Sequence, residues 1–242
     1  MGQAIVREVE GNGDYRILAG VDINADSVGA ACSFPVYGTI SDFPGKADVI
    51  IDFSHHTALP SLIDYAKKTK TPIVVCTTGH TDEEKGLMSE ASKDIAIFFS
   101  GNMSIGINLL IELCKNASAT LGLSFDVEII EKHHNQKLDA PIGTAIIIAD
   151  AIAGEREESE YVYDRHEVRR KRSPKEIGMH SVRGGTIVGE HEVIFAGNNE
   201  IVSLKHTAMS REIFANGALR AAAYLAKKSA GSYNMSDLIN GR

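Results

Sequence analysis

Cysteine is scarce in this sequence, and so is basic charge. Cys32, Cys76 and Cys114 are widely spaced and form no C-x-x-C pair. This argues against a disulfide framework or a zinc ribbon and favours reduced thiols in a cytoplasmic protein. The formal net charge of −7 argues against a general nucleic-acid-binding protein, because such proteins depend on a cationic surface. Six prolines and 22 glycines do not amount to a fibrous or disordered composition.

Long apolar runs are also missing. No run reaches the roughly 18 residues that are needed to cross a bilayer, and the N-terminus lacks the basic-then-apolar pattern of a signal peptide. We therefore expect a cytoplasmic protein without membrane or nucleic-acid partners. With 242 residues, 43% of them hydrophobic, the chain is long enough for one large core or two modest ones.

The first hundred residues alternate short apolar segments with helical patterns. Strands are expected at residues 16–21, 47–53, 72–77 and 95–99, and a helix at residues 57–68. A second helix is expected to begin at Thr81, where Glu84 completes a capping box. Because alternating strands and helices favour parallel pairing with right-handed crossovers, this part predicts an open α/β sheet.

The pattern changes after Ser104. A helix is expected at residues 104–121, with Ile105, Leu109, Leu113 and Ala117 on one apolar face. Further on we expect a strand at 125–132, a helix at 143–153, a charged and loop-rich segment at 155–175, antiparallel strands at 186–195 and 200–206, and a helix at 210–228. The basic run at 169–172 is expected to be a solvent-exposed loop. Residues 105–210 therefore read as an α+β domain inserted into a first domain of residues 1–104 and 211–242.

The segment EIIEKHHNQKLDAPIGTA, residues 128–145, carries the most chemistry. A strand brings His133 and His134 to its end, Lys137 and Asp139 follow, and a helix begins shortly afterwards. Histidine exchanges protons near neutral pH, lysine neutralises a carboxylate, and the free N–H groups of a helix N-terminus favour an anion. This combination suits a small dianionic substrate. A polar loop with incidental histidines is the alternative, and it would be the better explanation for an isolated His-His pair.

The same segment resembles a known family. The pattern E-x-H-H-x-x-K-x-D-A-P-x-G-T-A is similar to the signature loop of the dihydrodipicolinate reductases. Other segments match this family in the same order along the chain: CTTG at 76–79, NMSIGIN at 102–108, SVRGG at 181–185, GEH at 189–191, and the stretch from His206 to Arg220.

The resemblance implies an activity, a fold and a set of roles. The expected reaction is the reduction of 4-hydroxy-tetrahydrodipicolinate to tetrahydrodipicolinate by NADH or NADPH, in the diaminopimelate route to lysine. His133 corresponds to the general acid, and Lys137 to a residue that binds substrate and assists protonation. His134, Gly143 and Thr144 fall where the family holds a substrate carboxylate. The implied fold is a Rossmann-type parallel sheet domain plus an inserted substrate-binding and tetramerisation domain with a mixed or antiparallel sheet.

The resemblance also assigns cofactor contacts. The corresponding positions are Gly2, Asp22, Phe53, Ser54, Thr77, Thr78, Gly79, Ser100, Gly101, Asn102 and Met103. Asp22 slightly favours NADH, because an acidic group at this spacing holds a free ribose hydroxyl. No metal is expected, since His133 and His134 point apart as neighbours on a strand. A metal-dependent hydrolase built on these histidines is the weaker alternative.

The N-terminus departs from the family pattern. The opening strand and the earlier glycines of the dinucleotide motif have no counterpart, and Gly2 matches the last glycine of that motif. Such an omission should leave apolar surface and backbone groups of the parallel sheet unpaired. Either the biological start lies upstream, which the intact downstream motifs favour, or the chain is a catalytically silent homologue that keeps substrate-domain binding or assembly.

Overall fold

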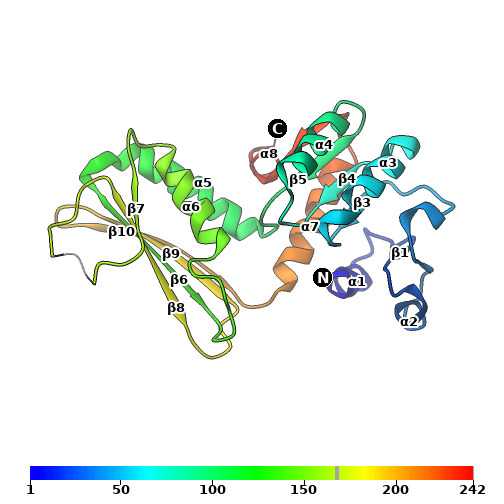
Figure 1. Ribbon diagram of the computed structural model, residues 1–242, viewed down its shortest axis with the longest axis horizontal. Coiled ribbons are helices and arrows are strands. Elements are labelled where there is room, and N and C mark those ends of the chain that lie inside the picture. Colours follow the sequence, from blue (N-terminus) through cyan, green and yellow to red (C-terminus); the bar gives the residue numbers. More distant parts are fainter. Residues whose placement is uncertain (167–168, 242) are drawn as a thin grey trace. The chain divides into compact units, whose positions relative to one another are not determined.

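The chain forms two compact units, shown in Figure 1 as a computed structural model. The structure describes residues 1–166 and 169–241. The first unit consists of residues 1–103 and 212–241, and the second of residues 104–211 apart from the two undescribed positions. Within the described residues, no helix is long and apolar enough to cross a membrane.

A four-stranded parallel sheet forms the centre of the first unit. Its order is β11-β5-β4-β3, with β3 (Ile50–Asp52), β4 (Ile73–Val75), β5 (Ala96–Phe99) and β11 (Gly231–Tyr233). The helices of this part are α3 (Leu59–Thr69), α4 (Asp82–Ala91), α7 (Glu212–Leu225) and α8 (Met235–Asn240). The β-branched residues of the inner strand β4 are fully buried, as is usual for a strand covered on both faces. The expected parallel α/β sheet is confirmed.

The N-terminal segment lies beside this sheet without extending it. It contains α1 (Gly2–Glu10), which packs against α7, then β1 (Gly20–Val21), α2 (Ala25–Gly29) and β2 (Val36–Tyr37). The strand expected at 16–21 is reduced to the two residues of β1, which pair in parallel with β2 only. Within the described chain, β3 is therefore an edge strand of the four-stranded sheet, and Ile50 and Ile51 on it are half-buried.

The second unit contains a five-stranded mixed sheet of order β10-β9-β6-β8-β7. The strands are β6 (Asp126–His133), β7 (Glu160–Val162), β8 (Glu176–Arg183), β9 (Gly189–Ala196) and β10 (Ile201–Ala208). The β6–β8 and β7–β8 pairs are parallel, and the β6–β9 and β9–β10 pairs are antiparallel. The expected second domain with a mixed sheet is thus confirmed, although β7 and β8 were not predicted.

Two helices cover one face of this sheet. Apolar side chains of α5 (Ile105–Leu121) and α6 (Gly143–Ala153) share a core with alternate residues of β6, β8 and β9. The predicted apolar face of α5 is not the buried one: Leu109 and Leu113 are 47% and 44% exposed, whereas Leu110 and Cys114 are buried. The helix is apolar on most of its circumference, so periodicity alone does not identify the face that packs.

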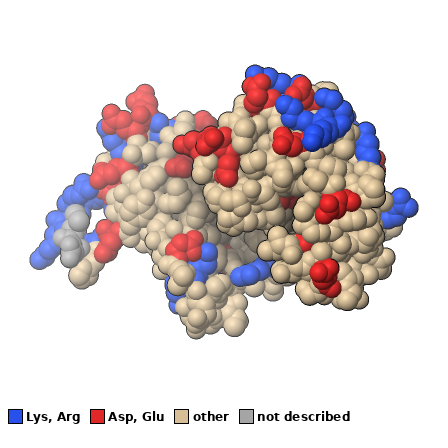
Figure 2. Space-filling model, turned by 45° about the vertical axis from the view of Figure 1, so that its right-hand side comes forward, with Lys and Arg blue, Asp and Glu red and all other residues tan. Residues whose placement is uncertain are grey.

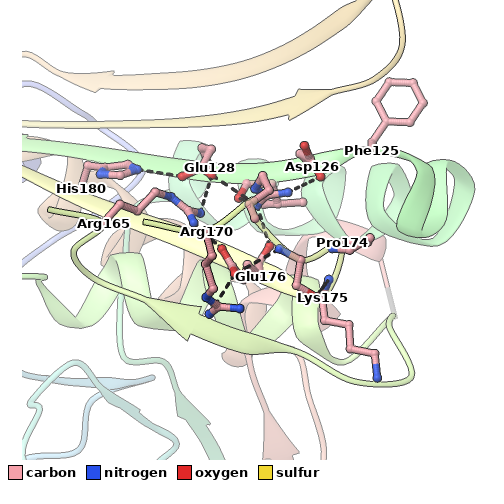
Figure 3. Close-up of polar contacts among 12 residues, drawn as sticks. Phe125, Asp126, Glu128, Arg165, Arg170, Pro174, Lys175, Glu176 and His180 are labelled. Carbon is pink, nitrogen blue, oxygen red and sulfur yellow. Dashed lines mark hydrogen bonds and ion pairs between the residues drawn. The ribbon is translucent and has the colours of Figure 1, made fainter. Parts of the chain in front are cut away.

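Ion pairs fix the charged segment before β8 against the sheet. The carboxylate of Glu176 is almost fully buried and binds Arg165, Arg170 (3.2 Å) and the backbone N–H of Ser173 (3.1 Å). Figure 3 shows the two arginines converging on it. A carboxylate buried to this degree needs such partners, because its desolvation is costly. Ion pairs therefore anchor part of the charged stretch, while Arg169, Arg170 and Lys171 of its basic run are exposed, as expected.

A second carboxylate, Glu128 on β6, extends the same network. It accepts hydrogen bonds from Arg165 (2.8 Å) and His180 (2.7 Å), as Figure 3 shows, and it pairs with Arg172 (3.2 Å). Gly178 lies opposite Glu128 on β8, and a Cβ there would approach the carboxylate to 1.8 Å. Arg172, from the basic run expected to be solvated, is only 20% exposed and also binds Asp126.

In the view of Figure 2, acidic and basic side chains lie near one another in several groups, and other residues cover broad areas between them.

Candidate functional site

The alternation of β6 places Glu131 and His133 on the helix-covered face of the second unit's sheet. Residues two apart on a strand share a face, and both side chains are buried, with 1% and 6% exposure. Nδ1 of His133 lies 2.7 Å from Oε2 of Glu131. Arg183 ends β8 directly beside His133 and donates two 2.7 Å hydrogen bonds, one to each oxygen of the Glu131 carboxylate.

The partners of Glu131 keep it ionised. Burial by itself would raise its pKa, but hydrogen bonds from Arg183, Ser181 and His133 outweigh burial and hold the pKa below its usual range. An ionised carboxylate only accepts hydrogen bonds, so the proton of the shared bond lies on Nδ1 of His133. The opposite ring nitrogen, Nε2, faces Gly189, where a Cβ would lie only 2.9 Å away. Glycine at this position therefore leaves room for the imidazole.

Two further histidines continue the row across the sheet. His191 on β9 is opposite Glu131, and His206 on β10 is opposite His191. The His191 ring is 4% exposed and meets His133 edge-on at 5.5 Å between centroids. Burial, followed by the neighbouring charge of His133, lowers the pKa of His191 to about 4, and burial also lowers the pKa of His206. His191 is thus neutral at pH 7, and Glu131 bonds to His133 alone of the three histidines.

The loop after β6 carries the other predicted substrate residues. His134 is half-buried and follows the strand, and Nζ of Lys137 lies 2.6 Å from Oδ1 of Asp139. Arg183 connects this loop to the buried pair, because it also donates a 2.6 Å hydrogen bond to the backbone oxygen of Asp139. One arginine therefore organises both the Glu131–His133 pair and the loop that presents Lys137.

Helix α6 begins at Gly143, next to this loop. Its N-cap residue, Ile142, provides no side-chain hydrogen bond to the helix. Gly143 and Thr144 form the first turn, and the positive end of the helix dipole lies there. The structure therefore places the predicted His134, Lys137, Gly143 and Thr144 on one β6–α6 connection, together with His133.

Sequence reasoning missed Glu131 and Arg183 as site residues. The E-x-H spacing was a usable signal for Glu131, since it puts both side chains on one face of a strand. Arg183 belongs to the SVRGG segment that matches the family, but it lies 52 positions from Glu131, and its contact with that carboxylate depends on the pairing of β6 with β8.

The predicted cofactor residues of the first unit gather around Asp52. This carboxylate ends β3 and is 5% exposed. One of its oxygens accepts hydrogen bonds from the N–H (2.9 Å) and the hydroxyl (2.5 Å) of Ser54, and the other accepts the Thr77 hydroxyl (2.9 Å). Asp52 thereby joins the carboxyl ends of β3 and β4, which is where open α/β sheets bind their ligands.

A pocket of about 280 Å³ opens at this edge of the sheet. Phe53, Ser54, Thr77 and Thr78, four of the predicted cofactor residues, line it, and so do three others: His55, His56 and Cys76. Burial raises the pKa of the Cys76 thiol far above its usual range, so this cysteine is an inert lining group.

The other predicted cofactor residues do not line this pocket. Gly2 begins α1, Asp22 follows β1 and accepts the N–H of Asn24 (2.8 Å), and Gly79 follows Thr78 with a φ of +81°. The segment of Ser100, Gly101, Asn102 and Met103 follows β5. Met103 is buried, and α7 approaches it so closely that a Cβ on Gly217 would lie 1.7 Å from its carbonyl oxygen.

Metal ligation has no support in the described part of the chain. None of its His, Cys, Asp and Glu side chains form a group of three or more that could hold a metal ion.

Family models cover nearly the whole chain. The model described as dihydrodipicolinate reductase, N-terminus, matches residues 1–103, and the model of the C-terminus matches residues 106–239. The chain belongs to the dihydrodipicolinate reductase family. The resemblance found in the signature loop is thereby confirmed, and with it the assignment to the oxidoreductases.

Curated members of the family are closely similar over their full length. The 4-hydroxy-tetrahydrodipicolinate reductase of Caldanaerobacter subterraneus subsp. tengcongensis is 50% identical over 240 residues, which cover 99% of this chain and 94% of that protein. The protein of the same name from Clostridium tetani is 48% identical, with 99% and 93% coverage.

Solved structures agree with this family. The dipicolinate-bound dihydrodipicolinate reductase from Paenisporosarcina sp. TG-14 has a TM-score of 0.80 and 25% identity, covering 96% of this chain and 92% of that one. The WlbA dehydrogenase from Bordetella pertussis, solved with NADH and UDP-GlcNAcA, shares the fold alone, with a TM-score of 0.52, 16% identity, and coverage of 86% and 75%.

Proposed function

We propose that this chain reduces 4-hydroxy-tetrahydrodipicolinate to tetrahydrodipicolinate with NADH or NADPH, in the diaminopimelate route to lysine. The observation that carries the proposal is the buried Glu131–His133 pair, held by Arg183 beside the Lys137 loop, in a chain about half identical to reductases of this name. We assign cofactor binding to residues 1–104 and 211–242 and substrate binding to residues 105–210.

His133 is the proton donor in this proposal. The hydroxyl leaves as water together with a proton from the neighbouring ring carbon; a hydride then adds to the carbon that carried the hydroxyl, and a proton is returned to the neighbouring carbon. Glu131 accepts the hydrogen bond that Nδ1–H donates, so Nε2 is the atom that hands a proton to the ring carbon next to the one that is reduced. Because Arg183 keeps Glu131 ionised, a negative charge stays behind the imidazole and holds its orientation before and after the transfer.

Lys137 and the start of α6 hold the two carboxylates of the substrate. The Lys137–Asp139 pair is partly exposed, with 30% and 53% of the side chains accessible. Exposed ion pairs contribute little free energy, so a substrate carboxylate can replace Asp139 at low cost. His134, Gly143 and Thr144 are assigned to the second carboxylate, which the helix dipole favours. Holding both carboxylates fixes which face of the ring is reduced.

The pocket at the end of β3 and β4 fits part of a nicotinamide dinucleotide. Its 280 Å³ lie at the lower limit for small-molecule sites, so the remainder of the cofactor requires further contacts. Reductases of this family use NADH or NADPH, and their N-terminal domain binds the nucleotide. When bound, the cofactor supplies the hydride. The residues assigned to the remaining contacts are Gly2, Asp22, Gly79, Ser100, Gly101, Asn102 and Met103.

We also infer a homotetramer that acts in the cytoplasm. The sheet of the second unit has a face that α5 and α6 do not cover, and on it Val182 and Ile201 are 43% and 68% exposed. A sheet face with apolar side chains and no covering layer can bury them against another copy of the chain. Three cysteines present as free thiols support the reducing compartment. A solution mass of about four times 26.1 kDa is expected, and a monomer mass would contradict the assembly.

The histidine variant His133→Gln tests the reductase proposal. It should lower kcat far more than it changes the dissociation constant for pyridine-2,6-dicarboxylate, because His133 acts on proton delivery. Wild-type turnover in this variant would remove His133 from the mechanism. A wild-type chain that binds the dicarboxylate but oxidises neither nicotinamide would instead support a silent homologue.

A further inference from the structure

A second histidine–carboxylate pair lies at the rim of the cofactor pocket. His56 begins the short 3-10 helix η2 (His56–Ala58) after β3, and Glu84 lies in the first turn of α4, after β4. Nδ1 of His56 is 2.8 Å and 3.1 Å from the two carboxylate oxygens of Glu84. The contact therefore joins the segments that follow two adjacent parallel strands, and His56 also lines the pocket.

Glu84 is fixed in place from the helix side. It completes the capping box predicted for α4, in which its carboxylate accepts the Thr81 N–H (2.8 Å) and its own N–H reaches the Thr81 hydroxyl (3.2 Å). The hydrogen bond from His56, and then that from Thr81, hold the pKa of Glu84 below its usual range. The carboxylate is thus ionised and immobile, and it faces the imidazole as a fixed negative charge.

The other groups that face His56 do not provide an equivalent cation. The His55 ring is 4.3 Å away between centroids, but its Nδ1 contacts the neutral Thr57 hydroxyl. The buried His80 ring is 6.4 Å from His56; neither of its ring nitrogens makes a hydrogen bond within the described chain, but its Nδ1 lies 3.5 Å from Oε2 of the same Glu84. The lining of the pocket contains no lysine or arginine, so its only groups able to carry a positive charge are His55 and His56.

We propose that His56, held by Glu84, binds a phosphate oxygen of the nicotinamide dinucleotide through Nε2. Nδ1 is committed to Glu84, and Nε2 has no partner among the described residues. Glu84 places a fixed negative charge on one side of the ring, and a charged N–H donor on the other side makes the stronger kind of hydrogen bond to phosphate. His56 is then a cofactor-binding residue and Glu84 a positioning residue. The inference rests on the proposed function, because it presumes a nicotinamide cofactor.

The assignment predicts a pH-dependent affinity for the cofactor. A phosphate contact made by an imidazolium exists only while the ring carries both protons, so the assignment predicts that NADH binds more weakly at pH 8 than at pH 6. The titratable side chains next to His56 are His55, His80 and Glu84, and of these only Glu84 is hydrogen-bonded to it. Binding of pyridine-2,6-dicarboxylate should not share this dependence on His56.

The test compares NADH dissociation constants for wild type, His56→Gln and Glu84→Gln, measured by calorimetry from pH 6 to pH 8. Glutamine at position 84 can keep the capping box, so the variant removes the charge without removing the cap. Glu83→Gln is the matched control, because Glu83 is an exposed carboxylate in the same helical turn. At pH 6.5 we expect about tenfold weaker binding for both test variants, a flat pH profile in His56→Gln, and wild-type behaviour in the control.

NADH affinity tests the phosphate contact, whereas turnover tests the proposed function. A wild-type chain that binds NADH without reducing substrate, and that loses binding on His56→Gln, contradicts the proposed function but supports the phosphate assignment. Equal NADH affinity in wild type and His56→Gln overturns the assignment, even where turnover is normal. The assignment is also overturned if Glu83→Gln weakens NADH binding as much as Glu84→Gln does, since a general charge effect would then explain the data. A wild-type chain that binds no NADH removes both proposals.

Discussion

Replacing Glu131 by glutamine removes one buried charge while almost preserving the shape of the side chain. In the native protein, its carboxylate receives two hydrogen bonds from Arg183 and one from Nδ1 of His133, all at 2.7 Å. The amide of glutamine has a single accepting oxygen, so it cannot serve both partners as the carboxylate does. The imidazole of His133 then loses the group that fixes its orientation and its Nδ1 proton.

The expected effect follows from the size of these contacts. A positioned general acid contributes about 10²- to 10⁴-fold to a rate, so Glu131→Gln should lower kcat by about 10²-fold or more. Arg183 is 20% exposed and would lose a charged partner, which costs about 1–3 kcal/mol in the free energy of unfolding. The change in KM should be small, because Glu131 acts through His133 and not on the carboxylates of the substrate.

Steady-state kinetics on wild type, Glu131→Gln, His133→Gln and the double variant test this reasoning. Adding Glu131→Gln to His133→Gln should cost little further activity, because the carboxylate works through the histidine. Glu192→Gln is the control, since it removes a charge from the same sheet at a partly exposed position of β9. Turnover within twofold of wild type in Glu131→Gln, or additive losses in the double variant, would refute the proposed role.

Three further predictions concern the same unit. Gly189→Ala places a methyl group about 2.9 Å from Nε2 of His133 and should reduce kcat at least about tenfold, with unchanged far-UV circular dichroism; normal kcat would contradict the tight approach. Lys137→Ala should raise KM and lower kcat together, and a pure kcat effect would argue against carboxylate binding. The pKa of His191, about 4 in the folded chain against about 6.5 unfolded, means that the unfolded state binds more protons between these values. Titration of His191 should therefore lower the free energy of unfolding by about 1.5 kcal/mol from pH 6.5 to pH 5, as measured by urea titrations. In His191→Phe this decrease should be absent, and the same pH dependence in the variant as in wild type would contradict the prediction.

Local signals predicted much of the fold. The capping box of Thr81 and Glu84 forms as expected, because it depends only on residues within one helical turn. The helix from Gly143 to Ala153 and the antiparallel strands β9 and β10 also lie close to their predicted places. Each of these elements has a clear local pattern that its tertiary surroundings do not override.

The failures have physical causes. β8 was not predicted because its charged first residue, Glu176, and the loop before it depend on arginine partners that no local pattern reveals. The packed face of α5 was assigned wrongly because the helix is apolar on several sides. At the site, His133 and Lys137 were found from a signature loop, whereas Arg183 required the β6–β8 pairing. Long-range contacts of this kind lie outside what a linear pattern can show.

The sequence departs from the family pattern at its N-terminus, and this departure bears on how the strands of the first sheet pair. The chain was expected to leave backbone groups unpaired where the family's opening strand would lie, and β1 and β3 do belong to separate sheets. The edge of β3 carries two half-buried isoleucines. Because this edge belongs to the cofactor domain, use of the cofactor is the property to measure directly.

That measurement is the consumption of NADH and NADPH by the 242-residue chain, with the substrate generated freshly from pyruvate and aspartate semialdehyde. We expect a substrate-dependent decrease in absorbance at 340 nm with at least one nicotinamide, and almost no decrease with His133→Gln. Consumption that continues at the wild-type rate in His133→Gln, or a wild-type chain that oxidises neither cofactor while still binding the dicarboxylate, would contradict it.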